Sequence, residues 1–147
     1  MEIREKQLIP FFRDYEKRFE QGLSGDIDIE ESTAAFADYF VGASPAGIAG
    51  SKNDESFGTS LPEGFEFYKS VGTVSMKIDT IHVTELDDLH CMTRIHWVSQ
   101  NTRKDGITVV IPFEVIYFTQ HLNDQIKIFA FITGDEKKVL RENGLLS

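Results

Sequence analysis

The sequence is poor in cysteine, in long apolar runs and in positive charge. Its single cysteine, Cys91, excludes a disulfide within the chain. No apolar run reaches the roughly 18 residues of a membrane-spanning helix, and the first residues do not have the pattern of a signal peptide. Basic residues number 15 against 24 acidic ones, and the net charge of -9 gives no basis for binding phosphate backbones or anionic lipid. We therefore expect a cytoplasmic protein that binds no nucleic acid and no membrane.

Length and composition indicate one packed domain. A chain of 147 residues buries roughly 70% of its unfolded surface on folding, which is sufficient for one hydrophobic core. Hydrophobic residues make up 41% of the chain, and they include 12 Phe and 4 Tyr. Disordered chains contain fewer such residues. We predict a single domain over residues 1–147.

The first third of the chain has the apolar spacing of two amphipathic helices. In the first, apolar and aromatic residues recur every three or four positions, at Leu8, Phe12, Tyr15 and Phe19. This helix should end near Gly22. The second should begin after the N-cap Asp28 and continue to residues 39–41, because Phe36 and Phe40 follow the same spacing.

The next segment contains many residues that interrupt regular structure. Residues 41–60 include four glycines and a proline, which predicts a short strand and a loop. Ser60 and Glu63 then have the spacing of a capping box, with Pro62 in the first turn. A third, short helix is expected over Leu61–Ser70.

From Thr73 onward the apolar period changes to two, which is typical of strands. The alternation changes phase after Ile78, and this predicts a bulge near Asp79 or Thr80. Turn-forming pairs at 87–88, 105–106 and 123–124 separate three further strands, expected over 90–99, 107–120 and 125–133. Helices followed by an antiparallel meander place the chain in the α+β class.

Two of these strands are apolar on both faces. Residues 109–118 and 126–132 each contain one charged residue, so both faces of the sheet should be covered. The helices can cover one face, and we expect a second subunit to cover the other, which makes the protein a homodimer through the convex face of the sheet. In the alternative, the residues after Asp135 fold back over that face.

Several strings, taken in this order, resemble the nuclear transport factor 2-like superfamily. They are FFRDYEKRFEQG, ADYF and DQIKIFAFITGDE, with a Gly- and Pro-containing segment and a short helix between the last two. The resemblance spans most of the chain. It implies a cone-shaped, curved antiparallel sheet with three N-terminal-half helices packed on the concave face, and a pocket between them. The superfamily includes ketosteroid isomerases, SnoaL-like cyclases, dehydratases and non-catalytic association domains, so the fold does not decide the function.

The ketosteroid isomerase pattern can be compared position by position. Tyr15 precedes Gly22 by seven residues, as does the tyrosine that donates to the oxyanion in the isomerases. Glu114 precedes Phe118 by four, which is the spacing of their second, protonated donor. The isomerases have an Asp-Pro pair as the general base, whereas this chain has Ser44 before Pro45. Because a serine hydroxyl does not accept a proton at neutral pH without a base of its own, the isomerase reaction is not implied.

Glu114 is notable without any family. Its neighbours on the predicted strand are apolar, so the carboxyl is either buried or faces a cavity, where desolvation would raise its pKa. The alternative is an ion pair with Arg94 or Lys127 on neighbouring strands. His96 and Trp97 are adjacent on a strand, so only one of them can face the pocket.

The sequence therefore leaves three alternative hypotheses for the function. The first is a pocket that binds a mostly apolar, oxygen-bearing compound. The second is a cofactor-free isomerase, cyclase or dehydratase in which Glu114 is the acid or base and Tyr15 polarises a carbonyl, and the third is a non-catalytic dimerisation module. We expect no cofactor and no metal, because the histidines lack metal-site spacing. The predicted pocket-lining residues are Phe12, Phe19, Phe36, Tyr39, Phe40, Ser44, Phe65, Trp97, Ile116 and Phe118.

Overall fold

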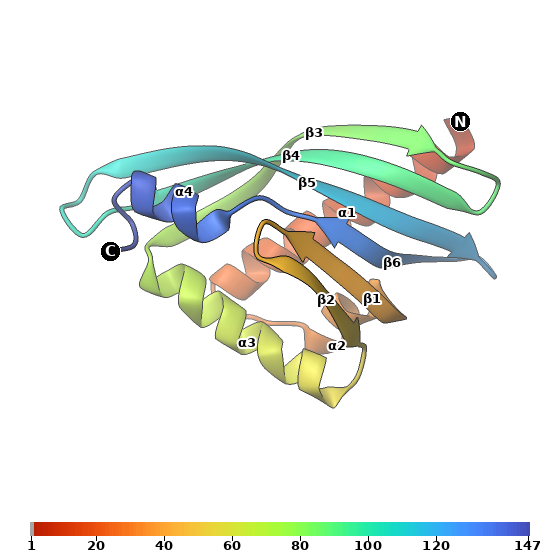
Figure 1. Cartoon of the computed structure of the whole chain (residues 1–147), viewed down its shortest axis with the longest axis horizontal. Coiled ribbons are helices and arrows are strands. Elements are labelled where there is room, and N and C mark those ends of the chain that lie inside the picture. The colour runs from red at the N-terminus through yellow and green to blue at the C-terminus, as the bar shows by residue number, and fades with distance from the viewer. Residues whose placement is uncertain (1) are drawn as a thin grey trace.

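A computed structural model describes residues 2–147 of the chain, apart from the side chains of residues 2 and 3. The elements in chain order are α1 (Glu2–Leu23), α2 (Ile29–Ala34), β1 (Phe36–Ser44), β2 (Gly47–Lys52), α3 (Glu55–Ser70), β3 (Thr73–Glu85), β4 (His90–Thr102), β5 (Thr108–Leu122), β6 (Gln125–Ile132) and α4 (Glu136–Glu142). The strands form one sheet in the order β2-β1-β6-β5-β4-β3 (Figure 1). Neighbouring strands are antiparallel except β1 and β6, which are parallel. The predicted α+β class is confirmed.

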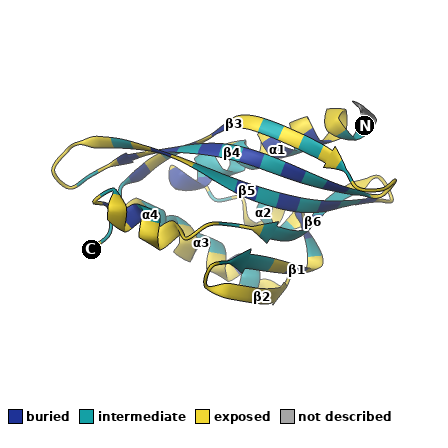
Figure 2. Ribbon diagram, turned by 45° about the horizontal axis from the view of Figure 1, so that its top comes forward, coloured by how far each residue is buried: buried dark blue, intermediate teal, exposed yellow. Residues whose placement is uncertain are grey.

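The helices lie on one side of the sheet, and burial along the strands follows from this (Figure 2). In β4 every second residue from Cys91 to Asn101 is buried, and the residues between them are half-buried or exposed. Leu8 and Phe12 of α1 are fully buried against the same face. The two-residue period therefore separates a concave face covered by helices from a convex face.

The predicted bulge and the predicted turn at residues 123–124 contribute to the shape of the sheet. The pairing of β3 with β4 shifts register between Ile78 and Thr80, as the change of phase predicted. Asn123 and Asp124 have φ values of 54° and 59°, which are those of a tight type I′ hairpin turn between β5 and β6. A bulge increases the local twist of a strand, and the long strands bend over the helices accordingly (Figure 1).

The second predicted helix is much shorter than expected. Asp28 caps it through a hydrogen bond from the Glu31 amide of 3.0 Å, as predicted, but α2 ends at Ala34 and Phe36–Ser44 is strand β1. Phe36 and Phe40 are four residues apart, a spacing that places them on one face of a strand as well as of a helix. Tertiary bonds select the strand, because the amide of Ile128 donates to the Ala35 carbonyl at 2.8 Å and starts the pairing with β6.

The third helix is longer than predicted. Its N-cap is Asp54, whose carboxylate accepts from the amides of Ser56 and Phe57, and the helix begins at Glu55. Ser60 is therefore not a cap, and its hydroxyl instead donates to the carbonyl of Phe57 at 2.6 Å. Pro62 lies inside the helix rather than in its first turn.

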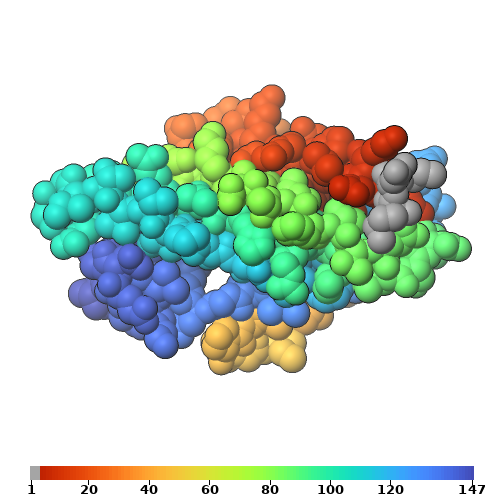
Figure 3. Space-filling view, turned by 90° about the horizontal axis from the view of Figure 1, so that it is seen from above, coloured from red at the N-terminus to blue at the C-terminus, as the bar shows by residue number. Residues whose placement is uncertain are grey.

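The C-terminal residues pack at the concave side. Leu140 of α4 and Leu145 after it form a small apolar cluster with Val71 and Ile111. Figure 3 shows this part of the chain lying against the connection between β4 and β5. The alternative in which these residues cover the convex face is therefore wrong. Across residues 2–147, none of the helices combines the length and the apolar character that crossing a bilayer requires.

Candidate functional site

A cavity of about 230 Å³ lies between the concave face of the sheet and the helices. Its walls are mostly aromatic. Trp97 of β4 and Phe113 of β5 stack on the sheet side with ring centroids 6.4 Å apart and planes inclined by 9°. Tyr15 and Phe19 of α1 face them, with ring centroids 6.3 Å and 6.1 Å from that of Trp97. The concave face therefore holds an open, aromatic-lined space rather than a filled core.

The buried Tyr117 and the partly buried Tyr15 form a polar pair in this cavity. The hydroxyl of Tyr117 hydrogen-bonds with the hydroxyl of Tyr15 and with the indole of Trp97. Burial is the main reason why the pKa values of Tyr15 and Tyr117 lie above the ordinary value of 10.0. Both side chains are therefore neutral at pH 7 and keep their O–H donors.

A second polar group lines the cavity farther along β4. The Thr73 hydroxyl donates to Oδ1 of Asn101 at 2.7 Å, and Nδ2 of Asn101 donates to the Ser99 hydroxyl at 3.0 Å. Nδ2 of Asn101 also donates to the carbonyl of Val109 at 3.3 Å. The amide of Asn101 is thus satisfied within the protein, while Thr73 and Ser99 retain free acceptor lone pairs.

The start of α4 forms the rim of the cavity. Asp135 and Glu136 line it there, and Oδ1 of Asp135 accepts from the Lys138 amide at 3.1 Å as the helix cap. Tyr68 of α3 hydrogen-bonds with Glu136, and burial followed by the nearby Glu136 carboxylate raises the pKa of Tyr68. Among the described residues that line the cavity, none is Lys, Arg or His.

The structure brings together part of the predicted pocket. Tyr15, Phe19, Phe36 and Trp97 all line the cavity. The expectation that Glu114 faces it is wrong, because Glu114 lies on the convex face and forms an ion pair with Arg94. The alternative ion pair with Arg94 is the one that the structure contains.

The connection between β4 and β5 explains why Glu114 faces outward. Residues 103–107 form it, so Thr102 pairs with Thr108 and Trp97 pairs with Phe113. His96 is the partner of Glu114, and Oε2 of Glu114 lies 3.4 Å from Nε2 of His96. Ile116 and Phe118 share the side of Glu114, because side chains alternate along a strand. They too lie on the convex face and not in the pocket.

A family model described as "NTF2-like protein (DUF6841)" matches residues 5–136. The chain belongs to this family. A search of curated protein sequences finds no match. The NTF2-like assignment agrees with the helix-covered sheet described above.

Solved structures share this NTF2-like fold at low sequence identity. Aln2 from a Streptomyces species is 15% identical, with a TM-score of 0.62 over 93% of this chain and 96% of that one. An NTF-2 like protein of unknown function from Shewanella oneidensis is 15% identical, with a TM-score of 0.58 over 81% and 92%. A ketosteroid isomerase-like protein from Erwinia carotovora atroseptica is 14% identical, with a TM-score of 0.55 over 80% and 85%. These likenesses concern the fold alone.

Three predicted pocket residues of this NTF2-like chain belong to the packed core instead. Phe12 is fully buried, with its ring centroid 5.0 Å from that of Tyr117. Phe40 packs on Phe57 at 4.7 Å. Phe65 lies over Gly22 so closely that a Cβ atom at Gly22 would be 2.2 Å from its ring. These rings support the cavity wall from behind.

Two further predicted pocket residues lie in the β1–β2 hairpin. Tyr39 is 70% exposed, because the side chains of Tyr39 and Val41 lie on the face of β1 that points away from the core. Ser44 ends β1, and its hydroxyl accepts from the Ala46 amide at 3.2 Å within the turn. Both predictions depended on a helix that continues to residues 39–41, and both fail with it.

The sequence prediction did not select several residues that the NTF2-like cavity uses. Phe113 and Tyr117 alternate with Glu114 along β5, so their selection required the correct strand face. Phe131 of β6 and Glu136 of α4 reach the cavity through the tertiary fold. The sequence did contain one signal for the correct face of β5. Pro112 and Glu114 lie on the same face of the strand, and a proline and a charged residue there indicate that this face points away from the core.

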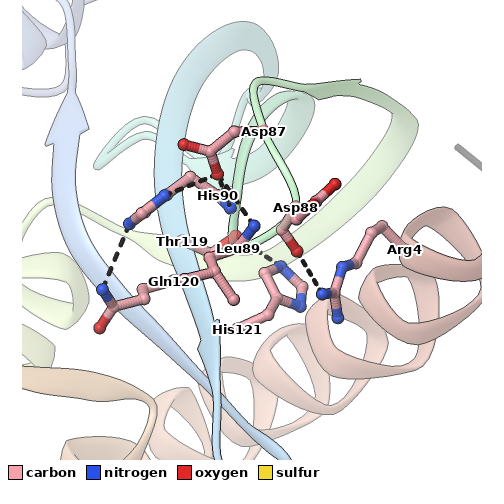
Figure 4. A network of polar contacts seen from close by, with 8 residues as sticks. All are labelled: Arg4, Asp87, Asp88, Leu89, His90, Thr119, Gln120 and His121. Carbon is pink, nitrogen blue, oxygen red and sulfur yellow. Dashed lines mark hydrogen bonds and ion pairs between the residues drawn. The ribbon is translucent and has the colours of Figure 1, made fainter.

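A separate polar cluster lies at the other end of β4 and β5, near the start of α1 (Figure 4). His90 Nδ1 is 2.8 Å from Oδ1 of Asp87, and Arg4 donates to the carbonyl of Asp88. The buried ring of His121 has Nε2 3.2 Å from the Thr119 hydroxyl. Burial, more than the charge of Arg4, lowers the pKa of His121 below the ordinary 6.5. This cluster does not line the cavity.

Proposed function

We propose that this NTF2-like protein binds a small, mostly apolar molecule that carries a hydrogen-bond-accepting oxygen. The size of the cavity supports this proposal. An apolar cavity of about 150 Å³ holds a benzene molecule, and the cavity here measures about 230 Å³. A substituted single ring or a compact two-ring compound fits this space. The fold itself commonly serves ligand binding or catalysis.

The placement of Tyr15 carries the proposal. The indole N–H of Trp97 can only donate, so the oxygen of Tyr117 accepts from it. The O–H of Tyr117 then donates to the oxygen of Tyr15, and the O–H of Tyr15 remains for a ligand. A donor that faces the cavity favours a carbonyl or ether oxygen, because a ligand that covered this O–H without accepting its hydrogen bond would leave it unpaired at a cost of about 1–3 kcal/mol.

The positions of Glu114 and Ser44 argue against the isomerase-like reaction. Glu114, the acid or base of the alternative enzymatic reading, is paired with Arg94 on the convex face. Ser44, which stands where the isomerases have their base, lies in the β1–β2 turn. Neither group can reach a molecule held against Tyr15, so neither can transfer a proton to or from it.

We also propose that the protein is a homodimer through its convex face. That face has an apolar surface that includes Ile116, Phe118 and Phe129, with the rings of the two phenylalanines 6.2 Å apart. Ile132, at the end of β6, is 43% exposed. A second copy would remove this surface from water, and the Arg94–Glu114 pair gives such an interface a polar component.

A pair of matched probes tests the binding proposal. Trp97 is the one tryptophan of the sequence and lines the cavity, so its fluorescence reports on occupancy directly. Acetophenone carries a carbonyl oxygen, whereas the isosteric α-methylstyrene carries a methylene group in its place. We expect acetophenone to bind about 2- to 10-fold more tightly, the value of one net hydrogen bond.

Substitutions then locate the hydrogen bond. Tyr15→Phe should abolish the preference for acetophenone, and Tyr39→Phe should retain it because Tyr39 is exposed outside the cavity. Far-UV circular dichroism checks that both variants are folded. The proposal is refuted if neither probe produces a saturable change in Trp97 fluorescence. An unchanged preference in Tyr15→Phe refutes the role of Tyr15.

A further inference from the structure

The charge of the cavity narrows the class of molecule that it accepts, if it binds a ligand as proposed above. Its charged lining residues are acidic, namely Asp135 and Glu136, and the described lining includes no basic side chain. Asp135 is engaged as the cap of α4. An anion in this space would meet a carboxylate and find no counter-charge, so desolvating it would be costly. Neutral molecules and cations do not have this desolvation cost without a counter-charge.

The aromatic walls provide a second, independent property. The ring of Phe19 on α1 lies beside those of Tyr68 on α3 and Trp97 on β4, at centroid distances of 5.6 Å and 6.1 Å. The faces of aromatic rings attract cations, with Trp the strongest, and the attraction increases where water is excluded. A group of rings around a small space is the arrangement that binds alkylated ammonium ions.

Glu136 places the negative charge of the cavity next to its aromatic wall. Its carboxylate hydrogen-bonds with Tyr68, so a negative charge lies beside one of the rings. Both residues line the cavity. A cation among the rings of Phe19, Tyr68 and Trp97 would therefore contact the faces of aromatic rings and also lie near a carboxylate.

We propose that the ligand of this cavity is an organic ammonium ion, a protonated or quaternary amine with a small apolar body. The ammonium group lies among Phe19, Tyr68 and Trp97 with Glu136 at the rim. The body extends toward Tyr15, where an oxygen of the ligand accepts its hydrogen bond. The net charge of -9 of the whole chain further favours the approach of a cation over that of an anion.

Three probes of nearly equal size test this proposal. Phenyltrimethylammonium is the cation, tert-butylbenzene is its neutral isostere, and benzenesulfonate is an anion with the same ring. Each is titrated into the full chain while Trp97 fluorescence is followed. We expect the cation to bind roughly 5- to 30-fold more tightly than the neutral isostere, and the anion to show no saturable binding.

A matched pair of variants isolates the contribution of Glu136. Glu136 and Glu55 each follow an aspartate N-cap as the first residue of a helix, so their replacement by Gln has the same effect on helix capping. Glu136→Gln should reduce the advantage of the cation over the neutral isostere by at least about 2-fold. Glu55→Gln should leave that advantage unchanged.

The outcomes separate the two proposals. Equal binding of the cation and the neutral isostere overturns the ammonium proposal and leaves the acetophenone result as it stands. Tighter binding of the anion overturns the ammonium proposal as well. Failure of all three probes together with acetophenone overturns both proposals. An equal effect of the two glutamate variants overturns the role of Glu136.

Discussion

Replacement of Gly72 by alanine should destabilise the fold because of one backbone contact. Gly72 follows α3 and has a φ of 91°, a conformation that L-residues rarely adopt. A Cβ atom at this position would lie 2.0 Å from the carbonyl oxygen of Thr102. That contact cannot be relieved by a side-chain rotation, since Thr102 is backbone-paired to Gly72 through an N–H···O bond of 2.8 Å.

The expected loss has two parts. The left-handed conformation costs about 1–2 kcal/mol for a residue with a Cβ atom. Displacing Thr102 weakens its hydrogen bond with Gly72, which contributes about 1 kcal/mol. Gly72→Ala should therefore lower the free energy of unfolding by about 2–3 kcal/mol, which corresponds to a fall in Tm of roughly 6–12 °C for a domain of this size.

Gly106→Ala is the matched control. Gly106 has a φ of 88°, close to that of Gly72, but a Cβ atom there would have no other atom within 4 Å. Its loss should be limited to the conformational part, about 1–2 kcal/mol. Urea unfolding followed by far-UV circular dichroism measures both variants. Equal losses in the two variants would show that the contact with Thr102 has no energetic effect.

Two further predictions concern the remaining polar and apolar surfaces. Burial holds the pKa of His121 below 6.5 in the folded chain. As the pH falls, the unfolded chain therefore takes up a proton at this residue before the folded chain does. His121 thus contributes stability above about pH 6.5, and that stability is lost as the pH falls below this value. The Tm should thus fall less between pH 7.5 and pH 5.5 in His121→Gln than in the wild type, while the exposed control His82→Gln should behave as the wild type. For the dimer, Phe118→Glu should shift the mass measured by light scattering to that of a monomer, and Leu86→Glu, in an exposed turn, should not. A monomeric wild type would contradict the proposed interface.

The elements that were predicted correctly are those whose apolar pattern fits only one kind of secondary structure. The register shift between Ile78 and Thr80 followed from a change of phase in the alternation. The helix α1 ends at Leu23, next to the expected Gly22, because its apolar stripe ends there. In contrast, the spacing of Phe36 and Phe40 fits a helix and a strand equally, and only pairing with β6 decides between them.

The sequence by itself determined that β4 and β5 have two alternating faces and that Tyr15 lies on the apolar stripe of a helix. Which face of β5 is concave was decided by a difference of one residue in the register of β5 against β4. A two-residue turn at Asp105-Gly106 would pair residue 104 with 107 and thus Trp97 with Glu114, on the same face. The actual connection of residues 103–107 pairs Trp97 with Phe113 instead. A slip of one residue moves every side chain of a strand to the other face, so tertiary packing placed the tyrosines in the cavity and Glu114 outside it.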